Sequence, residues 1–172
     1  MRTLGLVGLC LLIAGCASDS DTTVVEKVLQ DFGLQERPEG YVSGSDRVFA
    51  KLGSVARTEL KRLNAENRHG EIKFDDTGGL VGWYYKEIKI YENYYPLEAM
   101  PSGRIDANRT RGFIGYLEYE YRIYQSQRVA NRTLAAAEPA NVATDVRERE
   151  TYRYRFSSGG AWSGAKGERV RK

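Results

Sequence analysis

Cysteine and histidine are both scarce in this chain. The 172 residues include two cysteines, Cys10 and Cys16, and one histidine, His69. Residues 17–172 therefore contain no thiol, which excludes a disulfide, a thiol nucleophile and a cysteine metal site from that part of the chain. A Ser-His-Asp triad would have to use His69, and no GxSxG motif is present. We expect no catalytic residue, no metal and no cofactor, with His69 serving as a helix-end or solvent residue.

A long hydrophobic run is also missing. The apolar segment from Leu4 to Ile13 has about ten residues, whereas a ~30 Å hydrocarbon core needs roughly 20 helical residues. A membrane-spanning helix is therefore the weaker interpretation of this segment. Arg2 precedes it and the small residues Ala14 and Gly15 follow it, which is the order found in a secretory signal peptide.

The end of this segment, Ile13-Ala14-Gly15-Cys16, resembles the lipobox of bacterial lipoproteins. The resemblance implies that residues 1–15 are cleaved as a signal peptide and that Cys16 is lipidated on its thiol and often acylated on its new amine. Two or more acyl chains anchor a protein stably to a membrane. The alternative is an ordinary cleaved signal with an incidental cysteine.

The residues after Cys16 bear on the membrane. Ala17 and Ser18 lack the aspartate that retains many such lipoproteins in the inner membrane. By this resemblance we expect an anchor on the periplasmic side of the outer membrane, or on the cell membrane if the organism has one membrane. Nucleic acid is not an expected partner there.

Charge is unevenly distributed along the chain. Residues 17–40 carry a net charge of −4 and residues 147–172 a net charge of +5, within a total of +3. Composition divides the chain into a flexible polar tether at 16–22, one domain at 23–165 and a basic tail at 166–172. An uneven but solvated surface explains the same distribution without any partner.

Two helices are predicted before any strand. Residues 23–32 place apolar side chains on one helical face, and Gly33 ends that pattern. A longer helix is predicted from Asp46 to about Asn67, capped by Ser43 or Ser45, and its buried stripe consists of Val48, Leu52, Val55, Ala56, Leu60 and Leu63. Gly70 ends it.

After Gly70 the pattern alternates as in β-strands. Strands are predicted at 71–75, 80–95, 111–125 and 145–156, with a loop at 96–110, a helical turn compatible with 134–138 and a fifth strand that could begin at Ala161-Trp162. Residues 164–172 are expected to be unstructured. The order predicts an α+β fold in which an antiparallel, curled β-meander of four to five strands packs on the long helix. This order of elements, over residues 45–165, is similar to cystatin-like and NTF2-like architectures.

Aromatic side chains are concentrated in the predicted strands. Eleven of the twelve tyrosines lie between residues 84 and 154. Tyrosine suits a half-buried strand, because its ring is apolar and its hydroxyl polar. The alternative is a concave ligand pocket lined by Trp83, Tyr85, Tyr91, Tyr119, Tyr121 and Tyr152.

A row of arginines occupies one face of the last long strand. Arg147, Arg149, Arg153 and Arg155 share this face, and together they form a candidate anion-binding row. The alternative is ion pairing with Glu118 and Glu120 on the polar face of the neighbouring strand. Glu148 and Glu150 instead share a face with the tyrosines of their own strand.

The last residues, Arg171-Lys172, are similar to the end of the murein lipoprotein, whose terminal lysine is joined to peptidoglycan. This resemblance implies a cell-wall linkage at Lys172, although that family is a coiled coil with a different composition. Three hypotheses for function follow: a non-catalytic lipoprotein module that binds a protein or envelope component, a small-ligand-binding or hydrolytic protein with a tyrosine-lined pocket, and a structural tether joined to peptidoglycan.

Overall fold

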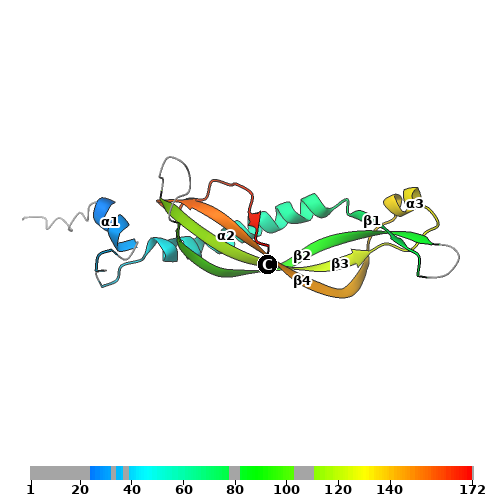
Figure 1. Ribbon diagram of the computed structural model, residues 1–172, viewed down its shortest axis with the longest axis horizontal. Helices are drawn as coiled ribbons and strands as arrows, with labels where there is room; N and C mark the ends of the chain where they lie inside the picture. The colour runs from blue at the N-terminus through cyan, green and yellow to red at the C-terminus, as the bar shows by residue number, and fades with distance from the viewer. Residues whose placement is uncertain (1–23, 32–33, 37–38, 78–81, 103–110, 172) are drawn as a thin grey trace, which may run out of the picture.

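The computed structural model describes residues 24–31, 34–36, 39–77, 82–102 and 111–171, and the arrangement is elongated (Figure 1). In chain order its elements are α1 (Val24–Asp31), α2 (Gly44–Asn67), β1 (Glu71–Asp75), β2 (Trp83–Ser102), β3 (Gly112–Gln125), α3 (Arg132–Ala137), β4 (Val142–Ser157) and β5 (Glu168–Arg169). The five strands form one antiparallel sheet in the order β1-β2-β3-β4-β5, so each strand pairs with the next one along the chain. The α+β fold predicted from the sequence is confirmed.

Helix α2 begins at a double cap. The Ser43 hydroxyl accepts a hydrogen bond from the Asp46 amide, and the buried carboxylate of Asp31, at the end of α1, accepts from the Gly44 amide. A carboxylate at a helix N-terminus satisfies an amide that has no partner within the helix and complements the helix dipole. Arg47 also pairs with Asp31, at 3.2 Å. These bonds attach α1 to the start of α2.

One face of the sheet, the inner face, is covered by α2 (Figure 1). Alternate residues of β3 point to it and are buried, namely Phe113, Gly115, Leu117, Tyr119, Tyr121 and Ile123. They meet Val48, Leu52, Val55, Ala56 and Leu63 of α2, as the two sequence patterns predicted. The opposite, outer face of β3 carries the polar side chains of Glu118, Glu120 and Arg122.

Several boundaries differ from those predicted. β2 does not end at Tyr95 but continues through Pro96 and Pro101 to Ser102. Both prolines pair with β3, and β2 has no second partner strand there, so their missing N–H groups leave no acceptor unpaired. β4 begins at Val142, three residues early, and α3 spans Arg132–Ala137 with Asn131 as its N-cap. Trp162 makes a single bridge to Phe156.

The expectation that residues 164–172 are unstructured is wrong for part of this segment. Glu168 and Arg169 form β5 on the edge of β4, opposite Arg153 and Tyr152. The Glu168 carboxylate contacts both Arg153 and Arg155, and the main-chain contact with β4 continues in the bond from the Val170 amide to the Thr151 carbonyl. This contact joins segments that local sequence patterns treat separately.

Glycine at position 115 sets the distance between α2 and the sheet. A Cβ atom there would lie 2.5 Å from a methyl carbon of Leu52 and 3.1 Å from the ring of Phe156, both fully buried. We predict that Gly115→Ala lowers the free energy of unfolding by about 1–2 kcal/mol, because a packed core cannot absorb an extra methyl group without strain. Urea unfolding monitored by circular dichroism measures this change.

Gly53 supplies the matched control, since a Cβ atom there meets nothing within 4 Å. Gly53→Ala should stabilise the protein by about 0.5–1 kcal/mol through its helix propensity. Equal effects of the two substitutions would contradict the close approach of α2 at Gly115.

Candidate functional site

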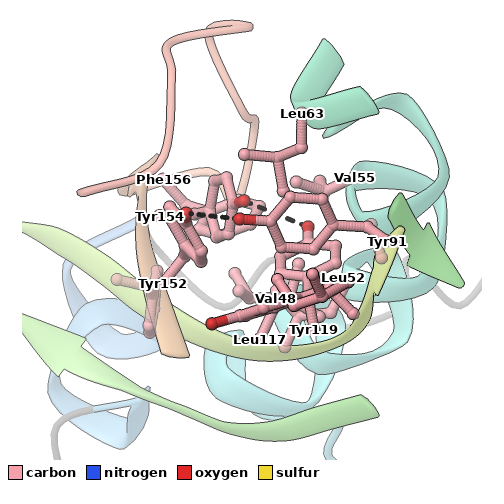
Figure 2. Packing of buried hydrophobic residues seen from close by; sticks show 14 residues of the cluster. Val48, Leu52, Val55, Leu63, Tyr91, Leu117, Tyr119, Tyr152, Tyr154 and Phe156 are labelled. Carbon is pink, nitrogen blue, oxygen red and sulfur yellow. Dashed lines mark hydrogen bonds between the residues drawn. The ribbon is translucent and has the colours of Figure 1, made fainter. Parts of the chain in front are cut away.

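A layer of tyrosine rings fills the space between α2 and the central strands (Figure 2). The Tyr119 ring centroid lies 6.2 Å from that of Tyr91 and 5.6 Å from that of Tyr152, in edge-to-face contacts. Tyr121 packs on Tyr91 at 5.3 Å, and Tyr154 meets Trp162 at 6.3 Å. These five tyrosines retain at most 7% of their exposure. We call them the tyrosine layer.

Every hydroxyl of the tyrosine layer has a hydrogen-bond partner. Tyr119 and Tyr154 bond to each other at 3.0 Å, as Figure 2 shows. Tyr121 donates to the carboxylate of Glu148. Tyr91 and Tyr152 both donate to one oxygen of Glu150, at 2.8 and 2.9 Å. A buried hydroxyl without a partner would cost about 1–3 kcal/mol, so these bonds permit so much tyrosine in a core.

Glu150 is the charged centre of this network. It is 5% exposed, and its second oxygen contacts Lys89 and Arg169, each at 3.0 Å. Burial by itself raises the pKa of this carboxyl, but the hydrogen bonds from Lys89, Tyr91 and Tyr152 outweigh it and leave the pKa below its ordinary value of 4.5. Burial raises the pKa of all five tyrosines of the layer. At neutral pH the centre is therefore an ionised carboxylate among neutral phenols.

The C-terminal segment covers one end of the tyrosine layer. The Gly167 amide donates to the buried carboxylate of Glu59 at 3.3 Å, and Lys166 pairs with Glu66 of α2 at 2.6 Å. A Cβ atom at Gly167 would lie 2.5 Å from the Tyr154 ring, so the segment lies directly on the layer. Arg169 then reaches Glu150 from β5.

The residues predicted to line a pocket separate into two groups. Tyr91, Tyr119, Tyr121 and Tyr152 come together in the tyrosine layer, where their rings are packed on one another. Trp83 is 40% exposed at the start of β2, opposite Asp75 of β1, and the ring of Tyr85 lies under the Arg128 guanidinium at 5.0 Å. The first group belongs to the filled core and the second to the surface beyond it.

The predicted arginine row lies exposed on the outer face of β4, and most of it is ion-paired. Arg149 contacts Glu118 and Glu120 across the β3–β4 ladder, at 3.0 and 3.2 Å. These are the two glutamates that the sequence offered as ion-pair partners for the row. Arg153 and Arg155 contact Glu168. Arg147 has no carboxylate partner among the described residues and lies opposite Arg122 in the register.

A groove of about 590 Å³ opens at the edge of the sheet beside Glu150. It lies where the C-terminal segment leaves β4 after the bond between the Val170 amide and the Thr151 carbonyl. Its lining is rich in guanidinium groups and consists of Arg149, Glu150, Thr151, Arg169, Val170 and Arg171. The groove and the underlying Glu150 network together form the candidate functional site.

Other predicted residues lie away from this site. His69 is exposed and accepts a hydrogen bond from Arg68 at the end of α2, and Asp75 bonds to Thr77 in the turn after β1. The described residues contain no group of three or more histidine, cysteine, aspartate or glutamate side chains that could hold a metal ion. Cys16 and Lys172, the residues predicted for lipidation and cell-wall linkage, lie outside the described residues.

Sequence reasoning did not identify Lys89, Glu150 and Arg169 as a cluster. One signal was present, because Glu150 shares its strand face with Tyr152 and a carboxylate on a buried face needs partners. The positions of Lys89 and Arg169 depend on strand register and on the return of the C-terminal segment. Those features are not readable from local periodicity.

We predict that Glu150→Gln lowers the free energy of unfolding by about 1–3 kcal/mol at pH 7, because the phenols of Tyr91 and Tyr152 and the ammonium of Lys89 lose their charged acceptor. Since folding lowers the pKa of Glu150, its stabilising effect is complete above pH 4.5 and is lost as the pH falls through the lower pKa of the folded state. The difference between variant and wild type should therefore shrink at pH 3. Urea unfolding at the two pH values measures it.

Glu66→Gln removes an exposed pair with Lys166 and is the control, with an expected change within about 0.5 kcal/mol. A Glu150→Gln variant as stable as wild type at pH 7 would show that the network does not hold the core.

Comparison with known proteins assigns no family to the chain. No family model, no curated protein and no solved structure matches it. Among the described residues, no helix is both long enough and apolar enough to cross a membrane.

Proposed function

We propose that this chain is a lipid-anchored lipoprotein of the bacterial envelope, and that its α+β domain is a non-catalytic module that binds a protein or another envelope component. The lipobox-like segment Ile13-Ala14-Gly15-Cys16 is the observation that carries the anchor. Its position directly after an apolar run too short to span a bilayer supports cleavage before Cys16. The absence of aspartate after the cysteine favours the periplasmic side of the outer membrane.

The state of Glu150 favours binding over catalysis. A buried general acid works at neutral pH when its environment raises the carboxyl pKa, so that a proton is available. At Glu150 the cations and phenol donors instead lower the pKa and occupy both oxygens. The carboxylate serves as an acceptor for structural hydrogen bonds, and a proton-transfer role would require breaking them.

The filled core supports the same conclusion. Tyr119, Tyr121 and Tyr154 are at most 2% exposed, and their rings and hydroxyls are engaged with one another and with carboxylates. A small ligand would have to displace these contacts to enter between α2 and the sheet. The surfaces available to a partner are the outer face of the sheet, its edges and the groove at β4.

The intact mass of the chain extracted from its native membranes after cell-wall digestion tests the anchor. We predict a mass that corresponds to cleavage before Cys16 plus acyl chains, and retention of the protein in the membrane fraction. Cys16→Ser should abolish both, because lipidation requires the thiol. Cys10 lies within the apolar run, so the control substitution Cys10→Ser should leave both the acylated mass and the membrane retention unchanged.

A wild-type chain without lipid, or a Cys16→Ser variant that is processed and retained like wild type, would overturn the proposed anchor. A muropeptide attached at Lys172 would favour the structural tether over the binding module.

A further inference from the structure

The two long edges of the sheet are protected to different degrees. One edge is the part of β2 that extends past the end of β1. There the amide and carbonyl groups of Tyr91 are bonded to the side chain of Asn64, at 2.8 and 2.9 Å. Farther along, Pro96 and Pro101 carry no N–H group, and two bulges interrupt the strand. Prolines, bulges and covering side chains are the usual means by which proteins prevent strand addition at an edge.

The β4 side lacks prolines and is covered over a short stretch only. Main-chain groups of a strand point alternately to its two neighbours. The Thr151 carbonyl faces the C-terminal segment, since it accepts from Val170, so the N–H and C=O groups of Arg149 and Arg147 point to the same side, away from β3. In the described part of the chain no strand pairs with these two residues on that side. They form an open edge that continues from the groove.

The side chains along this edge favour an acidic partner. Arg147 lies opposite Arg122 in the ladder; Arg122 pairs with Glu92 of β2 at 3.7 Å, whereas Arg147 has no carboxylate partner among the described residues. Arg169 and Arg171 add positive charge at the groove, whereas Glu148 and Glu150 are bonded to the tyrosine layer. A carboxylate placed opposite Arg147 by an added strand would lie on the same face and pair with its guanidinium group.

We propose that the β4 edge at Arg147–Arg149 binds an extended acidic segment of a partner protein, which adds to the sheet as an antiparallel strand. This proposal rests on the proposed binding function and names the partner's chemistry. The added strand would take the place in line with β5, beyond the point where the C-terminal segment leaves β4. Main-chain hydrogen bonds would supply affinity, and glutamate or aspartate at alternate positions would supply specificity.

The probe is a capped, fluorescently labelled seven-residue peptide that alternates threonine and glutamate, titrated by anisotropy against the full chain purified from membranes in detergent. We expect saturable binding that weakens with salt, and slower amide hydrogen exchange at Arg147 and Arg149. The same peptide with lysine in place of glutamate should bind at least tenfold more weakly.

Two variants at one position separate strand addition from simple charge attraction. Arg147→Pro removes an N–H group that points away from β3, so the existing ladder is kept, and binding should fall at least tenfold. Arg147→Gln keeps the N–H group and should lose only two- to threefold. An equal loss in both variants would mean that the side chain alone attracts the peptide, and would overturn the proposal.

N-methylated peptides give the same distinction with wild-type protein. In the proposed register the glutamate amides face Arg147 and Arg149, so methylation of those amides should abolish binding, whereas methylation of the threonine amides should leave it. Equal binding of both methylated peptides, or no binding of the unmodified acidic peptide, would overturn strand addition. The intact-mass measurement on Cys16 does not depend on this edge, so failure here is distinguishable from failure of the proposed anchor.

Discussion

The need to satisfy buried tyrosine hydroxyls determines how this sheet is covered. One helix, α2, lies over the inner face of a sheet whose central strands place five tyrosines beneath it. Their rings are five of the seven aromatic rings buried among the described residues, and their hydroxyls require hydrogen-bond partners inside the core. Glu150 meets two of these needs with one carboxylate oxygen, and Lys89 and Arg169 then balance the charge on the other. Because Arg169 belongs to β5, the same requirement holds the C-terminal segment against β4.

This arrangement separates the inside of the domain from the surfaces that remain for a partner. The tyrosine layer is a structural network, in which ring packing and hydrogen bonds use the groups that a pocket would offer to a ligand. Ion pairs neutralise much of the outer face of β4. In the described part of the chain, however, the edge at Arg147 has no strand partner and its guanidinium has no carboxylate partner. A filled core and an open, basic edge are consistent with the binding module that we propose.

The sequence predicted the elements that depend on local pattern. The apolar stripe of α2 and the alternation in β3 identified the residues that meet in the core. Gly70 separated α2 from β1, and the turn chemistry at Asp75 separated β1 from β2. It could not predict contacts that depend on register or on the return of a distant segment. Glu168 of β5 contacts two arginines fifteen and thirteen positions earlier, and the Tyr91 main chain is capped by an asparagine from α2. The candidate site lies at such a contact. Local pattern places Arg149 in the arginine row, Arg169 in the basic tail and Glu150 on the tyrosine-bearing face of β4, and does not bring the three together.

The titration of tyrosine absorbance with pH tests most directly whether the tyrosine layer is a filled, hydrogen-bonded core. Burial raises the pKa of five of the twelve tyrosines. We therefore expect a fraction of the absorbance change near 245 nm to be absent at pH 11 and to appear only together with loss of the circular dichroism signal, as the chain unfolds. If all twelve tyrosines ionise reversibly below pH 11 while the fold persists, the layer is open to water and the account of a closed, structural core is wrong.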